Sequence, residues 1–232
     1  MSASVVRVDM HLHTCWSFDS LNKPANVLAA ARERDIDRLV ITDHNEIQGA
    51  LELREMDPER VLVGEEVKTR EGFDVIGIFV EELIPKGTPA RETCERIRDQ
   101  GGVVYLPHPF DGTRAASAKQ LETLLDLIDV IEVHNARCWP GSLNTRARDW
   151  AVSRGKLMGG GSDAHTVREI GRGYVVMPPF APERGALLAS LRLGSVGGET
   201  TSPLYRLASN WAKIKKRIDF SRQSTAGIRA ND

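Results

Sequence analysis

Cysteine and net charge are both scarce in this chain, and each shortage argues against a class of protein. The 232 residues include three cysteines, Cys15, Cys94 and Cys138, which form no CxxC pair. An odd number at such spacing argues against a disulfide framework and a thiolate zinc site, and it fits a reducing compartment. The formal net charge of −1 gives no overall basic field of the kind that dominates nucleic-acid binding.

Long apolar runs are also missing. No stretch approaches the ~20 apolar residues that span a bilayer, and the first seven residues lack the apolar core of a signal peptide. We therefore expect a cytoplasmic protein with no membrane partner. The length suits one large α/β domain, since barrels of this class run to ~250 residues without dividing.

The chain does contain a regular alternation of strand-like and helix-like segments. Apolar runs rich in β-branched residues predict strands at residues 5–8, 39–41, 61–63, 75–80, 103–106, 130–133 and 157–159. Apolar spacings of three and four predict helices at residues 24–34, 46–56, 89–100, 118–127 and 144–154. Such alternation predicts a mostly parallel sheet, either open or closed into a barrel.

The histidines carry the strongest chemical signal. All six lie in short polar clusters that follow strand-like runs: His11, His13, His44, His108, His134 and His165. A barrel brings the carboxyl ends of its strands to one face, so clusters after different strands favour a barrel over an open sheet. His11 and His13 alternate at the end of a strand and point to the same side, where two imidazoles can bind one metal.

Seven short motifs follow one another between residues 5 and 165. They are Asp9-Met-His11-Leu-His13-Thr14, Ser17-Phe-Asp19-Ser20, Thr42-Asp43-His44, Gly64-Glu65-Glu66, Pro107-His108-Pro109, Glu132-Val-His134-Asn135 and Gly161-Ser-Asp163-Ala-His165. Together they resemble the polymerase and histidinol phosphatase (PHP) family of metal-dependent phosphoesterases. Residues 200–211 resemble a segment that accompanies a subset of these proteins.

The resemblance implies an α/β fold, a distorted (β/α)7 TIM-like barrel with its metal site at the carboxyl ends of the strands. Residues 1–194 would form the barrel domain, and residues 195–232 a C-terminal PHP-associated segment with a basic, partly disordered tail. We expect poor order in the last dozen residues. The basic run at residues 213–217 is expected to be a solvated helix face, although it could bind nucleic acid or an acidic partner.

The resemblance also implies two or three divalent metal ions, of zinc, manganese or iron, which these ligand types do not distinguish. Carried over residue by residue, the ligands of the first metal are His11, His13, Glu66 and Asp163. Those of the second are Glu66, His108 and His134. Those of the third are Asp19, His44 and His165.

Several of these residues have other interpretations. Glu65 competes with Glu66, because neighbours on a strand face opposite ways and one alone can enter the site. Asp19 could cap a turn instead of binding the third metal, and His108 between two prolines could be a rigid-turn residue. Asp9 and Asp43 could either orient imidazoles or cap loops.

The expected reaction is attack of a metal-bound hydroxide on phosphorus, with a third metal neutralising the phosphate oxygens. Asp163 is a candidate to protonate the leaving group as well as a ligand. Arg137 is the first candidate for a phosphate clamp, because a guanidinium binds phosphate through two parallel hydrogen bonds. Arg168, Arg172 and Lys68 are weaker candidates.

The leading hypothesis is therefore a phosphoesterase that acts on a small phosphorylated metabolite or nucleotide. A nuclease on short oligonucleotides is the nearest alternative, and an amide or lactone hydrolase could use the same metals. A non-enzymatic metal-binding module should lack some ligands, whereas every expected position is filled here. The sequence gives neither the metal, the substrate nor the oligomeric state.

Overall fold

The computed structural model describes residues 4–229. Within these residues a single sheet contains nine strands: β1 Val6–Leu12, β2 Arg38–Ile41, β3 Val61–Lys68, β4 Asp74–Ile78, β5 Val103–Leu106, β6 Val130–Asn135, β7 Leu157–Gly161, β8 Gly173–Met177 and β9 Ser195–Gly198. The helices of the same residues are α1 Pro24–Glu33, α2 Gln48–Met56, α3 Ala90–Asp99, the 3-10 turn η1 Gly112–Arg114, α4 Ala118–Leu124, α5 Ser142–Ser153, α6 Arg184–Leu191 and α7 Tyr205–Arg229.

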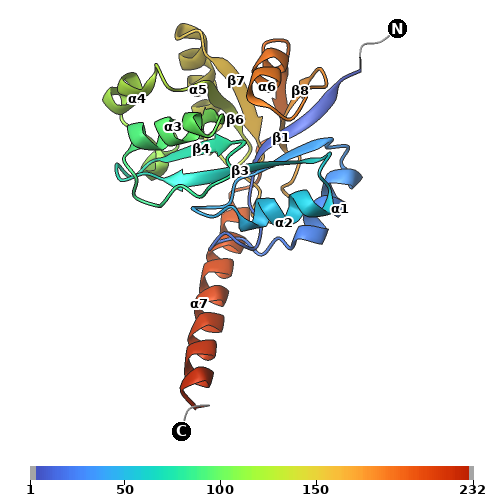
Figure 1. Ribbon diagram of the computed structural model, residues 1–232, viewed down its shortest axis with the longest axis vertical. Helices are drawn as coiled ribbons and strands as arrows, with labels where there is room; N and C mark the ends of the chain where they lie inside the picture. Colours follow the sequence, from blue (N-terminus) through green and yellow to red (C-terminus); the bar gives the residue numbers. More distant parts are fainter. Residues whose placement is uncertain (1–3, 230–232) are drawn as a thin grey trace.

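The sheet curls into a nearly closed barrel (Figure 1). Its strand order is β7-β6-β5-β4-β3-β2-β1-β8-β9. Closure happens where β1 ends, because Asp163 N donates to His11 O at 2.7 Å and His13 N donates to Ala164 O at 2.9 Å. These two hydrogen bonds bring the segment after β7 against the end of β1, so motifs 150 residues apart in sequence become neighbours.

The sheet is mostly parallel, as expected, but two of its nine strands run against the others. β1, β2 and β3 are parallel, as are β5, β6 and β7, whereas β4 and β8 run antiparallel to both of their neighbours. Residues 69–73 are the whole connection between β3 and β4. A parallel crossover needs a dozen residues or more, so this short link dictates a hairpin.

Apolar side chains fill the barrel below the polar rim. Along β3, Leu62 belongs to the buried interior cluster and Glu66 follows it on the same face four residues later. Along β6, Val130 and Glu132 repeat the arrangement. A second apolar layer lies between the outside of the sheet and helices α1 to α5. The carboxyl rim is thus the polar end of an otherwise apolar barrel.

The last helix, α7, leaves the barrel and projects beyond it (Figure 1). Its carboxyl end continues to Arg229, so residues 221–229, for which poor order is expected, are helical here; residues 230–232 lie outside the described residues. No helix among the described residues has the length and hydropathy needed to cross a bilayer.

Candidate metal centre

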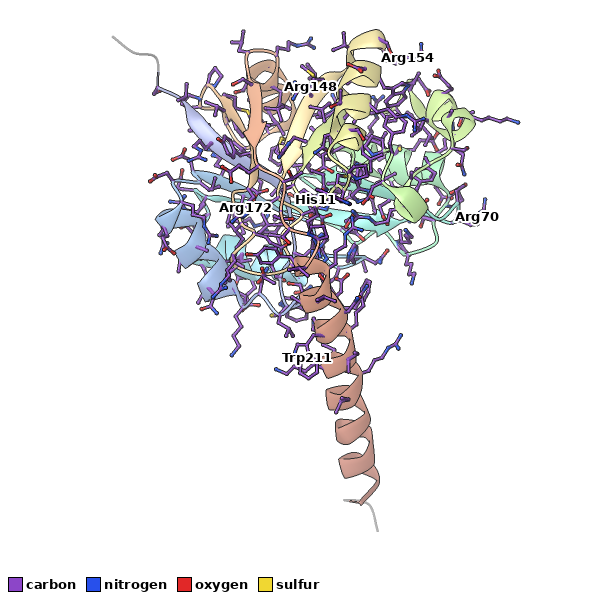
Figure 2. All side chains as sticks on the ribbon, turned by 180° about the vertical axis from the view of Figure 1, so that it is seen from behind. His11, Arg70, Arg148, Arg154, Arg172 and Trp211 are labelled. Atoms are coloured by element: carbon purple, nitrogen blue, oxygen red, sulfur yellow. The ribbon has the colours of Figure 1, made fainter. Side chains whose placement is uncertain are left out.

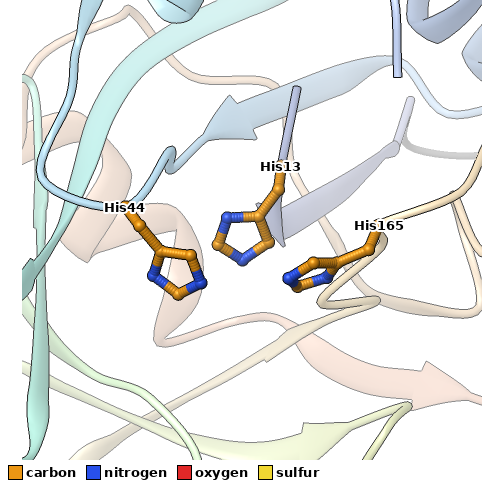
Figure 3. Close-up of side chains that lie close together, drawn as sticks. All are labelled: His13, His44 and His165. Carbon is orange, nitrogen blue, oxygen red and sulfur yellow. The ribbon is translucent and has the colours of Figure 1, made fainter. Parts of the chain in front are cut away.

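Imidazoles and carboxylates from remote parts of the chain meet at the carboxyl rim. His13, His44 and His165 approach one another from three separate loops (Figure 3). The ring centroids of His13 and His165 lie 4.2 Å apart, and those of His13 and His44 lie 4.4 Å apart. His11, Glu66 and Asp163 lie beside them and are fully buried. Eight of the nine predicted ligands belong to this cluster: His11, His13, Asp19, His44, Glu66, His108, Asp163 and His165.

Four ligand atoms surround one point in the middle of the cluster. His11 Nε2 lies 3.2 Å from His13 Nε2 and 3.5 Å from Glu66 Oε2. Asp163 Oδ1 lies 3.6 Å from His11 Nε2 and 3.2 Å from His13 Nε2. Ligands bound at ~2.1 Å in a tetrahedral site are ~3.4 Å from one another. The spacing therefore matches the edges of such a site.

Glu66 links this group to its neighbours. Its Oε1 lies 3.0 Å from His108 Nε2 and its Oε2 lies 2.9 Å from His44 Nδ1. Glu65 points the other way, where its Oε2 accepts a hydrogen bond from Ile84 N at 2.9 Å. Of the two glutamates, Glu66 is the one that enters the centre.

Asp19 completes a further group with His44 and His165. Its Oδ1 lies 3.6 Å from His44 Nε2 and 3.3 Å from His165 Nε2. Helix α1 begins after Lys23 without a side-chain cap, so Asp19 does not cap this helix. His108 forms a tight turn, and its ring also faces the cluster. The two interpretations of this residue therefore hold together.

His134 lies outside the centre. Strand β6 has a bulge between Glu132 and His134, so the two side chains do not share a face as plain alternation would require. Glu132 faces the centre, while His134 lines a separate pocket with Arg148 and Gly198. The sequence indicates the residue types of this motif but not the bulge, which has no signature of its own here.

Neighbouring groups orient the imidazoles. Glu132 Oε1 lies 3.0 Å from His11 Nδ1, and Ser17 Oγ lies 3.1 Å from His13 Nδ1. Ser17 in turn donates to Asp43 Oδ1 at 2.7 Å. With the Nδ1 atoms engaged, each Nε2 presents its lone pair to the centre. Asp43 thus supports His13 through Ser17.

Asp9 acts differently from Asp43. Its carboxylate accepts hydrogen bonds from the backbone N–H groups of Ser162 and Gly171, both at 2.9 Å. Asp9 therefore holds the loop that carries Asp163 in place and does not orient an imidazole. Of the two roles considered for Asp9, the structure supports loop capping. Burial raises the pKa of Asp9 to about 6 despite these bonds.

Two residues of the centre have strained backbones. His108 has φ of 28° and Asp163 has φ of 51°, in the left-handed region that non-glycine residues seldom adopt. Such strain persists where surrounding structure holds it, and it concentrates at functional sites. Here the hydrogen bonds from His108 N to Glu132 Oε2 and from Asp163 N to His11 O hold both residues.

Electrostatics keep the cluster charged. Burial opposes charge at every member, but His11 and Arg114 hold the pKa of Asp163 well below its ordinary value. Carboxylates raise the pKa of His11 well above its usual range and that of His44 to about 10. Burial and the neighbouring imidazoles lower the pKa of His13. Without a metal, protons on imidazoles thus balance the carboxylates.

Several inward-facing atoms of the cluster make no hydrogen bond. Among the described residues these include Asp19 Oδ1, Glu66 Oε2 and Asp163 Oδ1, all buried. Imidazole nitrogens lie near these oxygens without a well-aligned hydrogen bond, and a buried carboxylate oxygen in this state is stabilised by a bound cation. The residues therefore fit divalent metal ions, which nitrogen and oxygen donors of this kind bind.

A pocket of about 500 Å³ opens over the centre. Its wall includes a cationic set that extends beyond the residues predicted from sequence: Lys68, Lys86, Arg114, Arg137, Arg206 and Lys213. Arg114 reaches the cluster directly, since its Nη1 is 3.0 Å from Asp163 Oδ2. No motif marks Arg114, because only the fold brings η1 to the rim.

The predicted clamp, Arg137, is mostly engaged by protein groups. Its guanidinium contacts Glu169 Oε1 at 3.3 Å, donates to Ser209 Oγ at 2.9 Å and contacts the His165 ring. It lines the pocket but is 8% exposed. Arg168 and Arg172 are absent from the residues that line this pocket, whereas Lys68 is among them.

The basic run is more than a solvated face. Lys213 Nζ lies 3.7 Å from Asp19 Oδ2, and Lys216 donates to the backbone carbonyls of Cys15 and Ser17. The expectation that residues 213–217 form a solvated helix face is therefore wrong for Lys213 and Lys216. Helix α7 thereby forms one wall of the pocket.

Comparison with known proteins identifies this architecture. The family model of the PHP domain matches residues 9–126, and the family model of a PHP-associated region matches residues 141–196. The chain belongs to the PHP domain family. Two uncharacterized proteins of Methanocaldococcus jannaschii are similar to it. The first is 36% identical over a region that covers 61% of this chain and 89% of the relative. The second is 34% identical over 73% of this chain and 70% of the relative. Family membership makes the protein an enzyme, a metal-dependent hydrolase.

Solved structures confirm the barrel. PsfC from Pseudomonas syringae has a TM-score of 0.67 at 19% identity over 91% of this chain and 99% of its own. A lesion-specific endonuclease from Pyrococcus furiosus scores 0.62 at 15% identity, over 86% and 60%. An amidohydrolase from Chromobacterium violaceum scores 0.57 at 16% identity, over 88% and 96%. At such identities the likeness concerns the fold.

Proposed function

We propose that this PHP protein is a metal-dependent phosphoesterase that hydrolyses a small phosphorylated metabolite or nucleotide. The observation that carries the proposal is the set of Nε2 and carboxylate oxygen atoms 3.2–3.6 Å apart beneath a cation-lined pocket. Ligand spacing of this kind suits a metal ion, and a positive wall suits an anionic substrate.

We assign the ligands in three groups. His11, His13, Glu66 and Asp163 hold the first metal; Glu66 and His108 contribute to the second; Asp19, His44 and His165 hold the third. His134 is left out, because it lines another pocket. When bound, divalent cations here lower the pKa of water toward ~7 and offset the charge of phosphate oxygens.

The protein's own cations position the substrate. Arg114 is our choice for the phosphate clamp, ahead of Arg137, because its side chain is 30% exposed and lines the pocket beside Asp163. Its two terminal nitrogens pair with Asp163 and Asp111 here, so a phosphate would replace one of these carboxylates as a partner of the guanidinium fork. Asp163 keeps the role of ligand, and its low pKa argues against its carrying a proton at neutral pH.

A nuclease acting on short oligonucleotides is the second candidate. It is favoured by helix α7, whose Arg206 and Lys213 line the pocket mouth, and the related fold of an endonuclease is consistent with it. The amidohydrolase of the same fold keeps amide hydrolysis as a third outcome to be tested. All three reactions would use the same metal ions.

One panel separates these reactions. Protein stripped with a chelator and reloaded with manganese, zinc or iron should hydrolyse p-nitrophenyl phosphate or bis(p-nitrophenyl) phosphate, and the stripped protein should not. A preference for the diester, with binding to single strands that weakens steeply with salt, would favour the nuclease. Turnover of simple amides without turnover of either phosphate ester would overturn the proposal.

A further inference from the structure

Helix α7 turns small side chains toward the protein and leaves a row of large apolar side chains exposed. Ser209 and Ala212 face the barrel and are 6% and 2% exposed. On the opposite side Leu207, Trp211 and Ile214 are 63%, 60% and 51% exposed. Trp211 projects from the helix beyond the barrel (Figure 2). A surface helix normally shows the reverse arrangement, so an exposed stripe of this kind indicates a binding surface.

The spacing of the stripe is that of a coiled coil. Leu204, Leu207, Trp211, Ile214 and Ile218 are separated by three, four, three and four residues. This 3-4 repeat corresponds to the a and d positions of a heptad, a narrow seam that packs against another α-helix. A surface that buries itself in a lipid or a broad groove needs a wider apolar face.

Charge identifies the partner helix. The 25 residues of α7 contain seven lysines and arginines and one aspartate, whereas the rest of the chain contains 24 basic and 31 acidic residues. The helix is therefore strongly basic and the remaining body acidic. A second copy of the chain offers both a matching apolar stripe and an acidic body for the basic residues of α7, five of which lie between Arg206 and Arg217.

We propose that two copies of the chain associate through an antiparallel pair of α7 helices, with Trp211 near the two-fold axis. At 1.5 Å per residue α7 is ~37 Å long, so each distal half would reach back along the proximal half of the other helix toward its barrel. A parallel pair would instead bring the two basic runs at residues 213–217 together. The interface is self-complementary, as two-fold symmetry requires.

The same helix has a second face at the pocket. Arg206 donates to the backbone carbonyl of Arg137 at 3.0 Å, and Ser209 accepts from the Arg137 guanidinium. Pairing of the outer stripes would therefore hold the pocket wall in place from behind. The proposal concerns association and does not rest on the proposed function, because it is measured without substrate.

Sedimentation velocity tests the association directly. Full-length protein at micromolar concentration should sediment as a dimer that weakens with added salt, since part of the attraction is between charges. The double variant Leu207→Glu/Trp211→Glu should be monomeric, with a dissociation constant raised at least 100-fold. Leu193→Glu is the matched control, because Leu193 is 76% exposed but lies outside α7; it should remain dimeric.

Cysteine cross-linking tests the orientation. Leu204→Cys and Ile218→Cys, oxidised separately, should give few cross-links in an antiparallel pair, while an equimolar mixture should give the mixed dimer. Parallel pairing would cross-link each variant with itself and overturn the orientation. The unsubstituted chain, with its three cysteines, is the background control.

A monomer at every accessible concentration would overturn the proposal. So would a dimer that the double glutamate variant leaves unchanged. In the first case two probes identify what covers the stripe: vesicles of phosphatidylglycerol and phosphatidylcholine, and a single-stranded oligonucleotide. Binding of either by the wild-type chain and not by the Leu207→Glu/Trp211→Glu variant would replace the second copy with that occupant.

Discussion

The inner and outer faces of two rim strands show opposite electrostatics. On β3, Glu66 points into the centre and Glu65 away from it; on β6, Glu132 points inward and His134 outward. Inside, the pKa of Glu66 is lowered well below its ordinary value. Outside, burial raises the pKa of Glu65 to about 8 and lowers that of His134.

Burial penalises charge on both faces, so burial is not what separates them. The difference is whether groups of opposite charge lie within reach. Glu66 has His44 and His11 beside it, whereas a backbone N–H is the hydrogen-bond donor that reaches Glu65. The inner face is thus built to hold charge, which is what a metal centre requires, and the outer face drives its titratable groups toward neutrality.

Replacing one histidine on each face should give the largest difference between the two faces. His11→Ala removes a ligand atom at the middle of the cluster, so metal-supported turnover should fall by about 100-fold or more. His134→Ala should leave turnover within a few-fold of wild type. The measurement is kcat/KM on p-nitrophenyl phosphate with saturating metal, with circular dichroism to establish that both variants are folded. Equal losses in the two would refute the ligand assignment.

The paired glutamates give the next largest effect. Glu66→Gln should reduce the metal content by two ions together, because both carboxylate oxygens face different members of the cluster. Glu65→Gln should retain the wild-type content. Elemental analysis after gel filtration measures both. A loss of one ion in Glu66→Gln would show that Glu66 does not bridge, and a loss in Glu65→Gln would contradict its outward position.

Much of this inner face could be predicted from the sequence. All seven expected strands are present, and the histidines and acids after them converge because parallel strands end at a common rim. β8, β9, helix α6 and the full extent of helix α7 escape prediction. β9 is four residues long and half glycine, Ser195–Gly198, so it has neither the β-branched composition nor the alternation that marks a strand.

Three features of the site depend on tertiary structure and were beyond the sequence pattern. The bulge in β6 turns His134 away, although strand periodicity alone places it with Glu132. Arg114 reaches Asp163 from a 3-10 turn that no motif marks. The basic run of α7 contacts the loop after β1, nearly 200 residues earlier. Each depends on interactions between segments that are far apart in the sequence, and local sequence patterns carry no information about these.

The smallest expected effect is a pH-dependent one at Glu65. In the unfolded chain this carboxyl ionises near 4.5, whereas in the folded protein it keeps its proton until about pH 8. The folded state therefore binds more protons between these values, so its stability falls as pH rises through this window and levels off above it. The slope cannot exceed ~1.4 kcal/mol per pH unit for one group.

Glu65→Gln removes that titration. Its free energy of unfolding, measured with urea in chelator between pH 5 and pH 9, should fall less steeply with pH than that of the wild type. Glu81→Gln, on an exposed carboxylate, is the control and should follow the wild-type slope. Parallel curves for wild type and Glu65→Gln would mean that Glu65 is ionised in the folded protein. The outer face would then hold charge as well as the inner one, and the contrast between the two faces would rest on His134 alone.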